Sequence, residues 1–249
     1  AALPHGAARN VIDFIENGVD LSVWTEPSAA EERASAVTRF VFMGRLVDWK
    51  AVDLLLQAFQ RAAGAQPMAL QVIGDGPERA RLEALADRLG LRGGERGGGG
   101  SVSFLGWRPQ AECAGLLQRA DAMVLPSLWE CGGAVVLEAM SMGIPVIATD
   151  WGGPADYLDE TCGVLVPPTS RESFIDGLAS SMLSLARSPA QRAAMGAAGR
   201  QKVMQEFDWD VKVERMLSLY LDVLRSRPMS LVARRTASRI TVEDLGKDA

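Results

Sequence analysis

The sequence predicts an α/β fold, a Rossmann-like, doubly wound parallel sheet of about six strands. Short β-branched runs alternate with amphipathic stretches along most of the 249 residues. These runs are almost continuously apolar, which is typical of strands that helices cover on both faces. The chain is also long enough to bury a large core without disulfides or a bound metal. In such a fold we expect the ligand site beyond the carboxyl ends of the strands.

Six apolar runs are expected to form the strands, and a helix-like segment follows each. The runs are Arg39–Gly44, Leu70–Gly76, Val102–Gly106, Ala122–Pro126, Pro145–Thr149 and Gly163–Pro167. The helix after the first run has Val52, Leu55, Leu56 and Phe59 at helical spacing, and Asp48 is placed to cap it.

A glycine-dense stretch over residues 90–101 precedes the third strand. It is expected to be a surface loop at the amino-terminal edge of the sheet, although such a stretch could also cradle a phosphate. After the sixth strand we expect helices over residues 171–187, 190–205 and 208–225.

The predicted organisation has three parts. Residues 1–22 are an interdomain linker and edge segment, residues 23–227 are the Rossmann-like domain with its carboxyl-terminal helices, and residues 228–249 are a charged, frayed tail.

The composition excludes several classes of function. The single histidine, His5, argues against catalysis that needs a histidine at the reacting centre. Three cysteines without C-x-x-C spacing predict neither a zinc site nor a disulfide framework, so a cytoplasmic location is expected. The net charge of −5 argues against a nucleic-acid partner. The most apolar stretch, residues 132–149, is broken by Glu138 and Pro145 and is too short to cross a bilayer.

Two carboxylates are the first candidates for chemistry. Glu138 lies in an apolar helix expected over residues 133–142, and its helical neighbours carry no charge. Either it reaches solvent at the helix edge, or it accepts hydrogen bonds from vicinal hydroxyls such as those of a ribose. Glu130 lies in the preceding loop, as a simple capping acid or as part of a ligand site. Gly132 and Gly133 follow it and let a ligand approach the backbone at the helix start.

Two cations flank the turn after the first strand. Arg45 precedes this turn, and Lys50 is expected in the first turn of the next helix, where a cation opposes the helix dipole. As isolated surface cations they need no explanation, but a bound diphosphate would account for both.

Four tryptophans follow strand ends at the same edge. They are Trp49, Trp107, Trp129 and Trp151. Together they indicate either the wall of a ligand cleft or a face on which another domain closes.

These motifs together resemble the carboxyl-terminal half of a family 4 glycosyltransferase, within the two-domain GT-B group. The resemblance covers most of the chain. The matching segments are N-G-V-D at 17–20, G-R-L followed by lysine at 44–50, I-G-D-G-P at 73–77, F-L-G at 104–106, P-S-L-W-E at 126–130, L-E-A-M-S-M-G-I-P-V-I-A-T at 137–149 and G-G-P at 152–154.

The resemblance implies a retaining enzyme that transfers a sugar from a nucleoside diphosphate to an acceptor, with no metal or other cofactor. The catalytic residues that it implies are Glu130 at the donor sugar and Arg45 and Lys50 at the diphosphate. Glu138 would hold the ribose hydroxyls, while Trp107 and Arg108 would border the nucleobase. The donor-binding set is Glu138, Gly44, Gly132, Gly133, Ala134, Trp107 and Arg108.

The sequence departs from the family pattern at three places. Ala51 follows Lys50 where glycine is common, Cys131-Gly132 replaces a Gly/Pro-Phe pair, and Asp156 stands where glutamate is frequent. The first departure affects the phosphate turn, and the second affects the sugar pocket.

The resemblance also implies a partner, the family's amino-terminal acceptor domain, which this sequence lacks. The chain alone is therefore expected to bind a nucleotide-sugar donor without turning it over, and its terminal helix resembles the segment that packs back toward that domain. Membrane association at the inner face stays open for the complete enzyme.

Two alternatives remain. One is a non-catalytic nucleotide-sugar-binding module. The other is an NAD-dependent oxidoreductase, whose G-x-G-x-x-G fingerprint fails here because the run Gly74–Arg79 ends in arginine.

Overall fold

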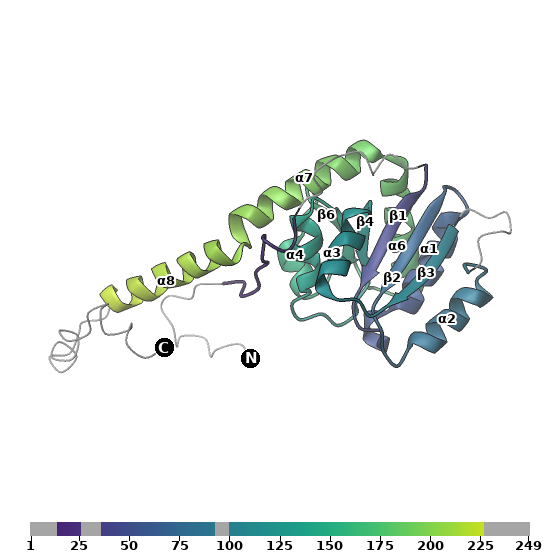
Figure 1. Ribbon diagram of the computed structural model, residues 1–249, viewed down its shortest axis with the longest axis horizontal. Helices are drawn as coiled ribbons and strands as arrows, with labels where there is room; N and C mark the ends of the chain where they lie inside the picture. Colours follow the sequence, from purple (N-terminus) through teal and green to yellow (C-terminus); the bar gives the residue numbers. More distant parts are fainter. Residues whose placement is uncertain (1–13, 26–35, 93–99, 227–249) are drawn as a thin grey trace. The chain divides into compact units, whose positions relative to one another are not determined.

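The computed structural model describes residues 14–25, 36–92 and 100–226. Its centre is a six-stranded parallel sheet with the strand order β3-β2-β1-β4-β5-β6, which confirms the predicted fold class (Figure 1). The strands are β1 Thr38–Met43, β2 Met68–Ile73, β3 Gly100–Gly106, β4 Ala122–Leu125, β5 Val146–Thr149 and β6 Gly163–Val166.

Helices cover the sheet on both faces, so its inner strands are largely buried on both sides. Helix α1 packs against α6 on one face, and α4 packs against α7 on the other (Figure 1). Every residue of β4 and β5 is buried. The helices are α1 Val52–Ala63, α2 Arg79–Arg88, α3 Gln110–Gln118, α4 Ala134–Ser141, α5 Gly153–Tyr157, α6 Arg171–Arg187, α7 Pro189–Glu206 and α8 Trp209–Ser226.

The chain divides into two compact units after Trp209, inside the predicted 23–227 domain. The first unit holds the sheet and helices α1 to α7, and the second begins at Asp210 within α8. His5, the predicted tail at 228–249 and most of the glycine-dense stretch lie outside the described residues.

The strand order reverses between β1 and β4, and this junction positions the site. The loops that leave the carboxyl ends of these two strands lie side by side, and the Leu128 N–H donates to the Trp49 carbonyl at 2.8 Å. Adjacent loops that diverge from a reversal point leave a crevice between them, which is where α/β sheets bind ligands.

The turns after β1 and β2 are joined closely. The Leu46 N–H donates to the Asp75 carbonyl at 2.9 Å. Gly74 has φ +135°, and a Cβ there would overlap the Gly44 carbonyl oxygen. The first glycine of the I-G-D-G-P motif, Gly74, is therefore required for the two turns to pack against each other.

The predicted cap of α1 is wrong. Residues Asp48–Lys50 form a short 3₁₀ turn, and the N-cap of α1 is Ala51, which adopts the left-handed conformation with φ 49°. The Asp48 carboxylate instead accepts from the Trp49 N–H at 2.8 Å. Lys50 consequently precedes α1 and does not lie in its first turn, because the 3₁₀ turn delays the start of the helix.

Two glycines in α7, Gly196 and Gly199, should respond differently to replacement by alanine. A Cβ at Gly196 would overlap the Gly143 carbonyl oxygen, whereas a Cβ at Gly199 would meet the Met140 Cγ at an ordinary 3.5 Å. Gly196→Ala should lower the free energy of unfolding by about 1–3 kcal/mol. Gly199→Ala should leave it unchanged or raise it by up to about 1 kcal/mol through helix propensity. Urea unfolding measures both, and equal effects would contradict this packing.

Candidate functional site

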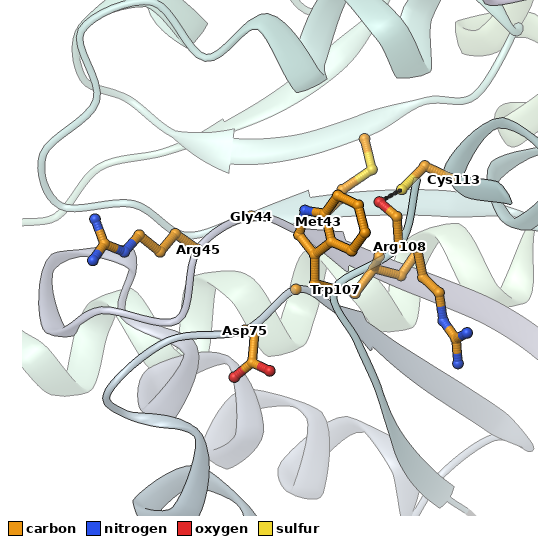
Figure 2. A pocket seen from close by; sticks show the side chains of 9 residues that line it. Met43, Gly44, Arg45, Asp75, Trp107, Arg108 and Cys113 are labelled. Atoms are coloured by element: carbon orange, nitrogen blue, oxygen red, sulfur yellow. Dashed lines mark hydrogen bonds between the residues drawn. The ribbon is translucent and has the colours of Figure 1, made fainter. Parts of the chain in front are cut away.

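A cavity of about 450 Å³ opens at the carboxyl edge of the sheet, where the chain leaves β1, β2 and β3 (Figure 2). It brings together four of the predicted site residues, namely Gly44, Arg45, Trp107 and Arg108. The full lining is Met43, Gly44, Arg45, Ile73, Gly74, Asp75, Trp107, Arg108 and Cys113.

The cavity has chemically distinct parts. The Trp107 ring, which is 71% exposed, lines it together with Met43 and Cys113. Burial raises the pKa of the Cys113 thiol, and the charge of Glu138 raises it further, so this side chain stays a neutral thiol. Figure 2 shows the Arg45 side chain extending away from the Trp107 ring. The cavity therefore offers an aromatic and apolar part and, separately from the ring, the guanidinium group of Arg45.

Sequence reasoning missed five residues of the lining, namely Met43, Ile73, Gly74, Asp75 and Cys113. Asp75 is the polar member of this group. Its carboxylate accepts from the Gly76 N–H at 2.7 Å and from Arg79 at 3.1 Å. The I-G-D-G-P motif was the available signal, since it directly follows a predicted strand.

Two of the predicted catalytic residues form an ion pair. The Lys50 ammonium donates to the Glu130 carboxylate, and the side chains are only 17% and 11% exposed. They come from the adjacent loops after β1 and β4. The Lys50 Cε lies 4.0 Å from the position that a Cβ of Gly44 would take, so the pair borders the cavity. An ammonium held here by a single carboxylate has further hydrogens to donate to an anionic ligand.

Glu138 is a half-buried carboxylate on α4. It has no hydrogen-bond or ion-pair partner among the residues that the structure describes, and burial raises its pKa from 4.5 to about 7. Its charge raises the pKa of the Cys113 thiol, and Cys113 lines the cavity, although Glu138 itself does not. A carboxylate kept in a desolvated position without a partner is a strong acceptor for a ligand that brings its own donors.

The predicted glycines form the turn into α4. Gly133 is the N-cap in the left-handed conformation with φ +67°, and Ala134 is the first, exposed residue of the helix. A Cβ at Gly132 would come within 2.5 Å of the Asn17 Nδ2. The turn thus presents bare backbone at a helix start, next to Glu130.

The four tryptophans at this edge are all exposed, by 49% to 71%. Trp107 lines the cavity, and the other three are not part of its lining. Trp129 and Trp151 lie with ring centroids 6.4 Å apart. Both interpretations therefore retain support, since Trp107 lines the cavity while Trp129 and Trp151 form an exposed aromatic pair.

A doubly wound sheet with a cavity beyond the carboxyl ends of its strands, on one side of the reversal in strand order, belongs to the class of nucleotide-binding α/β domains. The family described as Glycosyl transferases group 1 matches residues 26–202, and the chain belongs to this family. The fold is accordingly that of the carboxyl-terminal domain of a GT-B glycosyltransferase, as the sequence motifs indicated.

Individual relatives agree with this assignment. The GDP-mannose-dependent monoacylated alpha-(1-6)-phosphatidylinositol monomannoside mannosyltransferase of Corynebacterium glutamicum is 29% identical, over 87% of this chain and 56% of its own. Sucrose-phosphate synthase from Thermosynechococcus elongatus is 28% identical with a TM-score of 0.69, over 86% and 53% of the two chains. Anabaena Alr3699/HepE, solved in complex with UDP and glucose, shares the fold with a TM-score of 0.68 at 22% identity, over 86% and 56%.

The chain spans about half the length of the curated relatives that it matches. Within the described residues, every helix is too short or too polar to cross a membrane. Family 4 in particular stays a prediction, as do the roles of the individual site residues.

Proposed function

We propose that this chain is the donor-binding domain of a retaining, family 4 glycosyltransferase. The complete enzyme would transfer a sugar from a nucleoside diphosphate to an acceptor that an amino-terminal domain binds. The donor is supported by the printed names of relatives, one of which is GDP-mannose-dependent and another of which is in complex with UDP.

The observation that carries this proposal is the unpartnered Glu138 carboxylate near a cavity that Arg45 and Trp107 line. A nucleoside diphosphate has vicinal hydroxyls, a flat base and an anionic tail. Glu138 would accept from the ribose hydroxyls, the ring of Trp107 would lie against the base, and Arg45 would bind a phosphate oxygen.

The ion pair would act at the other end of the ligand. Breakage of the bond between the sugar C1 and the diphosphate oxygen leaves negative charge on the diphosphate. Lys50 and Arg45 would stabilise that charge, which supports transfer without a bound metal. Glu130 would hold Lys50 in place and would address the donor sugar with the backbone N–H groups that follow it.

Cytoplasmic location and association with the inner face of a membrane stay predictions. The second unit offers one feature relevant to the proposed acceptor domain. Its helix α8 carries exposed apolar side chains at helical spacing, namely Val213, Leu217, Tyr220, Leu221 and Leu224. We propose that this stripe packs on the acceptor domain.

A thermal-shift panel with UDP, GDP, ADP and NAD tests the donor proposal. One nucleoside diphosphate at a hundred times its dissociation constant should stabilise the chain by about 2.7 kcal/mol. Glu138→Ala and Lys50→Ala should remove the shift, whereas the control Arg61→Ala, which breaks two exposed ion pairs between α1 and α6, should retain it.

Stabilisation by NAD alone would contradict the proposal and favour the oxidoreductase alternative. The dependence on a second domain is checked separately, by incubating the chain with a sugar nucleotide and candidate acceptors. We expect binding without transfer, and any transfer by the chain alone would contradict this dependence.

A further inference from the structure

The segment before β1 is attached to the two residues between α7 and α8, Phe207 and Asp208. The Val19 N–H donates to the Phe207 carbonyl at 2.8 Å, and Val19 forms a parallel bridge with Asp208. Val19 and Trp24 are both 3% exposed. This anchoring fixes the backbone of residues 17–20 and therefore determines where the Asn17 side chain lies.

Asn17 lies between two parts of the donor site. Its Nδ2 donates to the hydroxyl of Tyr157 at 2.5 Å, across 140 positions of sequence. The same nitrogen is 2.5 Å from the point that a Cβ of Gly132 would occupy. Gly132 is not among the positive-φ glycines, so its backbone conformation is open to other residues. The nearest obstacle to a side chain at position 132 is therefore the Asn17 amide, which would have to move to admit one.

Helix α5 and the residue before it also contact this loop. The Gly153 N–H donates to the Cys131 carbonyl at 3.1 Å, and a Cβ at Gly152 would overlap the Glu130 carbonyl oxygen. Tyr157, the last residue of α5, is fully buried, with its ring edge-on to Phe207 at 5.3 Å. Burial raises the pKa of its phenol, so the hydroxyl stays neutral and can accept from Asn17.

We propose that Asn17 and Tyr157 are positioning residues for the loop Glu130–Gly133, which rests on the proposed donor-binding role of that loop. Asn17 presses on Gly132, and α5 holds Glu130 and Cys131. The hydrogen bond between Asn17 and Tyr157 joins these two supports. The loop is thereby kept in the conformation in which Glu130 holds Lys50 at the diphosphate and the backbone N–H groups face the donor sugar, so neither Asn17 nor Tyr157 needs to touch the ligand.

The first test measures how the chain distinguishes a nucleoside diphosphate from its monophosphate. Tyr157→Phe removes one hydroxyl and keeps the ring. Calorimetry should show that this variant binds the nucleoside diphosphate about three- to tenfold more weakly than the wild type does. Its affinity for the corresponding monophosphate should fall much less. The control Phe207→Leu instead alters the contact between the rings of Phe207 and Tyr157 and leaves the Tyr157 hydroxyl in place. It should lower the melting temperature and leave the ratio of the two affinities unchanged.

The second test exploits the contact at Gly132. Gly132→Ala should weaken diphosphate binding strongly in the wild-type background and much less when combined with Asn17→Ala, because truncation of Asn17 vacates the space that the new methyl group needs. Equal effects in both backgrounds would overturn the proposed contact.

Hydrogen exchange of the ligand-free chain gives a readout that does not depend on nucleotide binding. Amides of residues 130–133 should exchange faster in Asn17→Ala and Tyr157→Phe, but not in Phe207→Leu. Unchanged exchange would overturn the positioning role. Faster exchange with an unchanged affinity ratio would also overturn it. If no nucleotide binds the wild type, the proposed function fails, and the exchange rates alone decide whether Asn17 supports the loop.

Discussion

Replacing Glu138 with glutamine should make the ligand-free chain more stable than the wild type at pH 8, by about 2–3 kcal/mol. The reason is that burial raises the pKa of this carboxyl from 4.5 to about 7, and no described residue pairs with it. At pH 8 the folded wild type must hold a desolvated negative charge, whereas glutamine is neutral. The position is destabilising in the absence of ligand, as expected of a binding group.

The pH dependence gives this prediction a definite sign. Below pH 4.5 the carboxyl is protonated in both the folded and the unfolded chain, so the variant and the wild type should be equally stable. Between pH 4.5 and about 7 the unfolded chain releases this proton first, and the wild type loses stability relative to the variant. Above about pH 7 the difference should be constant.

Urea unfolding between pH 4 and pH 8 measures this difference. Glu160→Gln, at an exposed position, is the matched control and should show no comparable trend. A Glu138→Gln difference that does not change with pH would contradict the burial of the charge.

The same variant should lose selectivity for the ribose. Hydrogen bonds to a charged acceptor are lost, so affinity for the nucleoside diphosphate should fall about tenfold or more. The 2′,3′-dideoxy analogue of the nucleoside diphosphate should bind the wild type weakly, and it should bind the Glu138→Gln variant with about the same affinity. If the wild type does not distinguish the two ligands, Glu138 does not hold the hydroxyls.

Removing Lys50 is the second change with a large expected effect. Lys50→Met leaves the Glu130 carboxylate, which is 11% exposed, without its ion-pair partner. Loss of one member of a buried pair typically lowers the free energy of unfolding by about 3–5 kcal/mol, and the value here should lie near the lower end because Lys50 is 17% exposed. Binding of a nucleoside diphosphate should fall about a hundredfold, since a charge-assisted contact to phosphate is lost.

The double variant Lys50→Met with Glu130→Gln separates stability from binding. It removes both charges, so most of the lost stability should return, whereas nucleotide binding should not. Denaturant unfolding and calorimetry measure the two quantities. Arg61→Met, which breaks exposed ion pairs with Glu172 and Asp176, is the control and should change neither appreciably. Recovery of binding in the double variant would show that Lys50 acts only through Glu130.

Much of this arrangement was accessible from the sequence. The near-continuous apolar runs predicted every strand of the sheet, because burial on both faces leaves a strand almost no polar positions. The positions directly after those runs predicted the edge at which Gly44, Arg45, Trp107 and Arg108 gather. The isolation of Glu138 was also readable, since its helical neighbours are all uncharged and α4 supplies it with no partner.

Other features were decided only by contacts between distant segments. Asp48 has the residue type and spacing of a helix cap, yet a 3₁₀ turn and a left-handed Ala51 displace it. The pairing of Lys50 with Glu130 depends on two loops 80 positions apart, and the contact of Asn17 with Tyr157 spans 140.

Local periodicity records which face of an element is buried, so the sequence by itself determined the strands, the helices and the edge that carries the site. The conformation of a loop is set by whatever packs against it, which for Glu130–Gly133 is a segment before the first strand and a helix after the fifth. Only the tertiary structure could therefore determine which side chains in and near that loop are paired and which, like Glu138, have no partner among the described residues.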